Sequence, residues 1–161
     1  MAEKDAEFIV PPNRIKSKVT YNDSGVDMAA LARAEQVIAN LQGNYLQWVE
    51  DDLTNLQAAY EKARAEPDNR KRHLDEVFRI AHDVKGQGGS FGYHLMTIIA
   101  NQLCRTIEKY DATRDDVLEV VKLHIHALRL VISQRMEGDG GAAGASLVKG
   151  LEAVISKVAA R

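Results

Sequence analysis

One histidine and one lysine, three residues apart, stand beside a run of glycines in the middle of the chain. The stretch reads Arg79-Ile80-Ala81-His82-Asp83-Val84-Lys85-Gly86-Gln87-Gly88-Gly89-Ser90-Phe91-Gly92. An imidazole has an ordinary pKa of about 6.5, so much of it is a neutral nucleophile near pH 7. Two interpretations compete. Either a helix ends near Lys85 and the glycines form a loop, or the helix continues and the glycines clear space around a reactive His82.

Helix geometry favours an exposed histidine. Apolar and small residues recur along this segment at steps of three and four, the pattern of one buried helix face; they are Leu74, Val77, Ala81, Val84 and Gly88. His82 points about 120° away from this stripe, because each residue turns a helix by about 100°. The imidazole is therefore predicted on an open face beside Lys85 and Gly86. A glycine inside a helix costs roughly 1 kcal/mol relative to alanine, and close approach of another molecule is a reason for several of them.

The pattern His-x-x-Lys-Gly, followed after five residues by Gly, resembles the signature of histidine phosphotransfer (HPt) domains. Here it reads His82, Lys85, Gly86 and Gly92. The resemblance, which covers roughly residues 26–136, implies an antiparallel four-helix bundle. It also implies a carrier of phosphoryl groups between aspartates of receiver domains in a multistep two-component phosphorelay. Such a protein is a phosphocarrier and not an enzyme.

The same resemblance assigns roles to residues. His82 would be the phospho-acceptor, through Nε2, and Lys85 would stabilise the charge of the phosphoryl group. The surface on which the partner docks would use neighbours on this helix: Phe78, Arg79, Gly86 and Gly89. The implied partners are response-regulator receiver domains and a hybrid or sensor histidine kinase. No cofactor of its own is expected, and Mg²⁺ is expected on the receiver.

Helical periodicity organises the rest of the chain. Helices are predicted at about 27–40, 45–65, 70–89, 93–110 and 114–136, with a break or bend at Gly43-Asn44. The predicted parts are an extended or flexible segment (1–25), the bundle (26–136), a glycine-rich linker (137–144) and a C-terminal amphipathic helix that folds back on the bundle (145–161). The predicted fold is all-α, an antiparallel four-helix bundle with an additional N-terminal helix and a C-terminal helix.

Composition limits the function further. The length of 161 residues suits one domain, and the net charge of -2 gives no general attraction to nucleic acid or anionic membrane. No apolar run could span a bilayer, and the charged N-terminus lacks a signal region, so a cytoplasmic protein is expected. The resemblance favours a monomer, with the last helix as the route to a dimer. The single cysteine, Cys104, lies in an apolar helical pattern and is predicted to be a buried, inert thiol.

Other chemistries use different residues. A di-iron bundle needs Glu-x-x-His pairs, and the residue three before each histidine is Arg, Phe, Val or Leu, so no di-metal site is predicted. A non-catalytic helical adaptor, which binds a signalling partner through the face of His82 and the glycines, is the alternative function. A purely structural bundle, whose glycines permit close helix packing, would require a buried His82. On the preceding helix, Trp48 belongs either to the core, near Tyr45, or, if it is exposed, to a contact surface.

Overall fold

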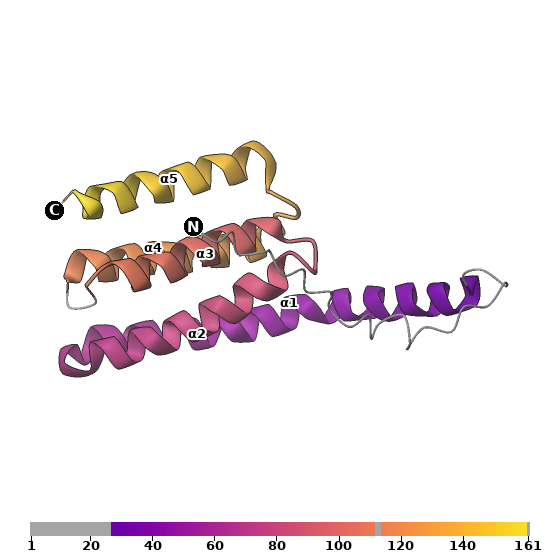
Figure 1. The fold of residues 1–161 in the computed structure, drawn as a ribbon, viewed down its shortest axis with the longest axis horizontal. Helices are drawn as coiled ribbons and strands as arrows, with labels where there is room; N and C mark the ends of the chain where they lie inside the picture. Colours follow the sequence, from indigo (N-terminus) through magenta and orange to yellow (C-terminus); the bar gives the residue numbers. More distant parts are fainter. Residues whose placement is uncertain (1–26, 112–113, 161) are drawn as a thin grey trace, which may run out of the picture. The chain divides into compact units, whose positions relative to one another are not determined.

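The computed structural model describes residues 27–111 and 114–160, and the predicted N-terminal segment, 1–25, lies outside these ranges. The described residues form five α-helices and a short 3-10 turn, without a strand. They are α1 (Met28–Ala65), η2 (Pro67–Asn69), α2 (Arg70–Gly88), α3 (His94–Lys109), α4 (Asp115–Ser133) and α5 (Gly141–Ala159) (Figure 1). The all-α fold class predicted from the sequence is confirmed. None of the helices in these ranges has both the length and the apolar character of a bilayer span.

The first helix is longer than predicted. Because α1 runs without interruption from Met28 to Ala65, the predicted break at Gly43-Asn44 and the separate N-terminal helix at 27–40 are wrong. One glycine costs a helix only about 1 kcal/mol. Tyr45 and Val49, which come two and six residues after Gly43, are fully buried. Their packing stabilises the helix across Gly43. The start of α1 is capped, since Oδ1 of Asp27 accepts hydrogen bonds from two backbone N–H groups at 2.9 and 3.0 Å.

The chain divides into two compact units, Met1–Ile38 and Ala39–Arg161. In the first unit the structure describes only residues 27–38, the beginning of α1. The apolar side chains there are exposed in the described structure: Met28, Leu31, Val37 and Ile38. Leu31, Val37 and Ile38 recur at helical spacing, as on an apolar helix face, but in the described structure this face is not buried.

The second unit holds the hydrophobic core. There α2 packs on α3, α3 packs on α4, and α5 packs on both α3 and α4; successive helices run in opposite directions (Figure 1). The remainder of α1 joins them, because Nη2 of Arg129 in α4 donates a hydrogen bond to the carbonyl oxygen of Leu53 at 3.2 Å. Large, fully buried side chains come from α1, α2, α3 and α4: Tyr45, Leu56, Tyr60, Leu74, Leu95, Met96, Ile99, Leu103, Ile125 and Leu128.

The glycine-rich stretch before α5 also differs from its prediction. α5 begins at Gly141, so the predicted linker, 137–144, is too long and the predicted helix start at 145 is too late. Gly138 donates a hydrogen bond to the carbonyl oxygen of Gly92 at 2.6 Å and accepts one from the N–H of Leu95 at 2.9 Å. Oδ1 of Asp139 accepts a hydrogen bond from the N–H of Gly141 at 2.8 Å. The two hydrogen bonds of Gly138 connect the segment to the beginning of α3, and α5 folds back on the bundle as predicted.

Candidate functional site

The two faces of α2 have different surroundings. Its inner face contains the whole stripe predicted from the sequence, and every member is buried: Leu74, Val77, Ala81, Val84 and Gly88. His82 is exposed on the outer face, with Arg79, Asp83 and Gly86 around it. The prediction of an exposed imidazole is confirmed. The purely structural interpretation, which required a buried His82, is wrong.

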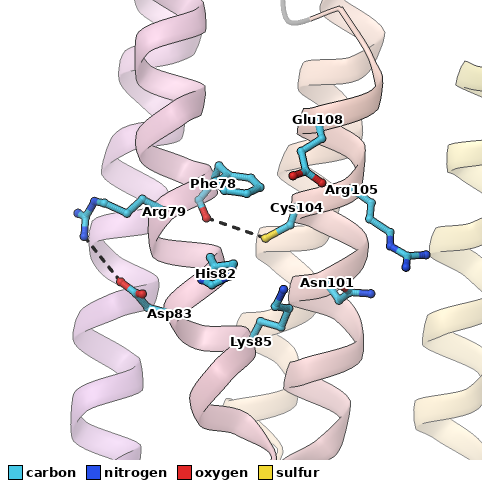
Figure 2. Close-up of a pocket in the computed structure, with 9 residues that line it drawn as sticks. All are labelled: Phe78, Arg79, His82, Asp83, Lys85, Asn101, Cys104, Arg105 and Glu108. Carbon is cyan, nitrogen blue, oxygen red and sulfur yellow. Dashed lines mark hydrogen bonds and ion pairs between the residues drawn. The ribbon is translucent and has the colours of Figure 1, made fainter. Parts of the chain in front are cut away.

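His82 borders an open pocket between α2 and α3, with a volume of about 370 Å³. Residues of both helices line it: Phe78, Arg79, His82, Asp83, Lys85, Asn101, Cys104, Arg105 and Glu108. Figure 2 shows Lys85 extending from α2 toward Asn101 on α3. Lys85 is half-buried and forms no ion pair within the part of the chain that the structure describes. The pocket therefore presents an imidazole and an ammonium group together.

Phe78 supports the imidazole from one side. Its ring is half-buried against the core, and its centroid lies 6.1 Å from that of His82 with an angle of 30° between the rings. The backbone carbonyl of Phe78 accepts a hydrogen bond from Sγ of Cys104 at 3.9 Å. Burial raises the pKa of this thiol, while the positive charge of Lys85 acts in the opposite direction. The predicted burial of Cys104 is confirmed, and its raised pKa keeps the sulfur protonated.

Arg79 turns to the other side of the outer face. Its Nη1 lies 3.7 Å from Oδ2 of Asp83, one helical turn later. Both side chains are exposed, so this ion pair contributes little to stability. In Figure 2 the guanidinium of Arg79 points away from α3, whereas the Lys85 side chain points toward it.

The glycines near the site lie in different structural elements. Gly86 and Gly88 lie inside α2, whereas Gly89 and Gly92 lie in the turn that follows. The helix therefore continues through the first two glycines only, and its predicted end at Gly89 is one residue too late. Gly92 has a φ of 82°, a left-handed conformation that glycine adopts without strain.

The space around each glycine shows whether it permits close helix packing or leaves open surface. A Cβ on Gly88 would lie 2.9 Å from the carbonyl oxygen of Tyr93 and 3.0 Å from the Cβ of Met96, so this glycine permits close packing of α3. A Cβ on Gly89 would make ordinary contacts at 3.6 Å. A Cβ on Gly86 would have no neighbour within 4 Å. Of the docking residues predicted on α2, Gly86 is thus the one whose missing side chain leaves open surface.

A second hollow lies on the α1 side of α2. It has a volume of about 450 Å³ and is lined by Trp48, Asp51, Asp52, Gln87 and Phe91. The exposed Trp48 fulfils the condition stated for a contact surface, but the sequence reasoning missed both aspartates. Their spacing of three and four residues after Trp48 places them on the same helix face and could have indicated them. The sequence analysis also did not predict that Asn101 and Arg105 on α3 line the pocket of His82. The one indication in the sequence is their four-residue spacing, which places them on the same helix face.

In the described ranges no group of three or more His, Cys, Asp or Glu side chains could hold an ion. His126 is exposed on α4, whereas His124 is fully buried.

Comparison with known proteins gives one family. The model of the Hpt domain matches residues 40–137. No curated protein and no solved structure matches the chain. The matched region contains His82, Lys85 and Gly86, and it spans more than half of the chain. The protein therefore belongs to the Hpt domain family.

Proposed function

We propose that this protein carries a phosphoryl group on His82 between aspartates of receiver domains. Its family implies histidine phosphotransfer in two-component signalling. One observation supports His82 as the carrier above all: it is exposed beside Lys85 in one pocket, and Gly86, a turn later, has open space around it. A second protein can therefore approach the imidazole closely.

The transfer would exchange one bond to phosphorus for another. The lone pair of Nε2 of the neutral imidazole attacks the phosphorus of an aspartyl phosphate. The bond from phosphorus to the aspartyl oxygen breaks, and the carboxylate leaves with its electron pair. The ring then holds a phosphorus–nitrogen bond, and the proton on Nδ1 can leave to solvent. The reverse sequence passes the group to a second receiver.

Lys85 would act on the charge of the phosphoryl group. The transition state of phosphoryl transfer is loose, so positioning and charge neutralisation supply most of the rate enhancement. The half-buried ammonium lines the same pocket as His82, where a docked partner excludes water and strengthens its interaction with phosphate. Mg²⁺ would come with the receiver.

The docking surface would centre on the outer face of α2. Phe78 gives it a half-buried apolar ring, Gly86 gives it open space, and Arg79 and Gly89 lie at its edges. We expect receiver domains and a sensor or hybrid histidine kinase as partners, with no role for nucleic acid or membrane. We also expect a monomer that works in the cytoplasm.

Phosphoryl transfer from a panel of phosphorylated receiver domains tests this function. Wild-type protein should take up label that is lost in acid and kept in base, as a phosphoramidate should be. His82→Gln should take up none, whereas His126→Gln, which changes an exposed histidine on α4, should be labelled normally. Lys85→Ala should be labelled about 10-fold to 100-fold more slowly.

Two results would contradict the proposal. Label that persists in His82→Gln would mean that another residue is the acceptor. No label from any receiver, with receiver binding intact, would favour the alternative of a non-catalytic adaptor that uses the same face.

A further inference from the structure

The hollow on the α1 side of His82 has a chemistry that phosphoryl transfer does not use. We call it the aromatic–acidic hollow; its residues are Trp48, Asp51, Asp52, Gln87 and Phe91. It lies entirely within the second compact unit. The pocket on the α3 side offers a cation to an anionic group, whereas this hollow offers aromatic rings and carboxylates.

The aromatic part is a supported platform. Trp48 is 43% exposed, and its ring centroid lies 6.4 Å from that of Phe91 in an edge-on arrangement of 74°. Phe91 in turn stacks on the buried ring of Tyr45, with centroids 4.6 Å apart and planes at 17°. Trp48 therefore offers an exposed indole beside a packed aromatic pair. The face of an indole attracts the side-chain cations of arginine and lysine.

The acidic part of the hollow consists of two neighbouring carboxylates, those of Asp51 and Asp52. In the described ranges, neither Asp51 nor Asp52 forms an ion pair. Asp52 is half-buried, and burial, followed by the charges of Asp83 and Asp51, raises its pKa. Arg79 opposes this shift, but its ion pair is with Asp83. A cation from another molecule would relieve this repulsion.

We propose that the aromatic–acidic hollow binds an arginine or lysine side chain of the receiver domain that docks on His82, and so selects among receivers. The identity of the partner rests on the proposed function; the preference for a cation does not. Gln87 is five residues after His82, which is about 7.5 Å along the helix axis. A protein interface of about 800 Å² per partner covers both places.

Charge complementarity supports this occupant over an apolar one. A peptide without a cation would cover two aspartates without compensating them, which costs free energy. An arginine would place its guanidinium plane on Trp48 and its N–H groups toward the carboxylates. The hollow therefore distinguishes receivers by a residue that is separate from their phosphorylated aspartate.

The first test needs no receiver. Trp48 is the single tryptophan of the chain, so its fluorescence reports on the hollow. We expect a saturable change when the full chain is titrated at low salt with a tetra-arginine peptide, and none with tetra-glutamate. Asp51→Asn/Asp52→Asn should raise the Kd about tenfold. Asp68→Asn/Asp75→Asn, which removes the same charge near the other end of α2, should leave it unchanged. No saturable change, or an equal Kd in both double variants, would overturn the proposal.

The second test uses the receivers. Binding of dye-labelled, unphosphorylated receiver domains is followed by fluorescence anisotropy, beside the labelling of His82. The proposal expects weaker binding to Asp51→Asn/Asp52→Asn and unchanged binding to the control pair. Equal Kd values, or no binding by any receiver, would refute the docking role. Binding that shows the expected loss, without any label on His82, would refute the phosphocarrier function and leave the cation site standing.

Discussion

Gly86 and Gly88 are two residues apart in α2, and they have opposite surroundings. A side chain on Gly88 would collide with the backbone that leads into α3, whereas a side chain on Gly86 would meet nothing within 4 Å. The fold therefore requires a glycine at position 88 but does not require one at position 86. The difference shows that the glycine-rich sequence combines two demands, close packing on the inner face and open surface on the outer face.

The strongest test of this comparison removes a side chain from the inner face. Leu74 is 1% exposed within the core, so Leu74→Ala should lower the free energy of unfolding by about 2–5 kcal/mol, through lost burial and the cavity left behind. Lys71→Ala, an exposed position on the same helix, should change it by less than about 0.5 kcal/mol. Urea unfolding followed by circular dichroism measures both. Similar values for the two variants would mean that α2 has no distinct inner face.

Gly88→Ala should also destabilise the protein. The new Cβ would lie 2.9 Å from a backbone carbonyl oxygen, and relieving such overpacking costs about 1–3 kcal/mol. The better helix propensity of alanine offsets roughly 1 kcal/mol of this cost. The midpoint of urea unfolding should fall, while labelling of His82 per folded molecule should be kept. An unchanged midpoint would show that α3 can move away from α2 without cost.

The sequence predicts correctly which residues of α2 are buried and which are exposed, but it does not predict what packs against each face. The stripe from Leu74 to Gly88 and the exposure of His82 depend on helical spacing, which is local. The separate purposes of Gly86 and Gly88 depend on where α3 lies, which spacing does not contain. The stretch after α4 is similar, because Gly138 is bonded to Gly92 and Leu95, more than forty residues earlier. A row of glycines therefore predicts a linker until its long-range partners are known.

Two histidines extend the comparison of outer and inner surroundings. His124 is fully buried in α4, where its Nδ1 lies 2.8 Å from the carbonyl oxygen of Val120. Burial lowers the pKa of His124, against the smaller opposite effect of that hydrogen bond. The unfolded chain thus takes up the proton near pH 6.5 and the folded chain only at lower pH. Stability should fall as the pH decreases below about 6.5, by at most about 1.4 kcal/mol per pH unit for one proton.

Unfolding at several pH values separates this contribution from those of other groups. His124→Leu should flatten the dependence between pH 7 and pH 5.5, because the variant has no buried imidazole to protonate. His126→Gln, at an exposed position two residues further along α4, should leave the wild-type dependence intact. A His124→Leu protein with the same slope as wild type would mean that carboxylates or other histidines cause it.

The smallest change in stability is expected at Gly86, where stability and function should move in opposite directions. Gly86→Ala adds a methyl group to an open helical position, which should stabilise the fold by about 0.4–1 kcal/mol. The same methyl group would stand where a receiver approaches His82, so labelling should become slower. Gly43→Ala is the matched control, because Gly43 is also helical with no neighbour within 4 Å. It should give a similar gain in stability with unchanged labelling. If both alanine variants are labelled at the wild-type rate, the partner does not need the open surface at Gly86, and the outer face of α2 is only a solvated helix surface there.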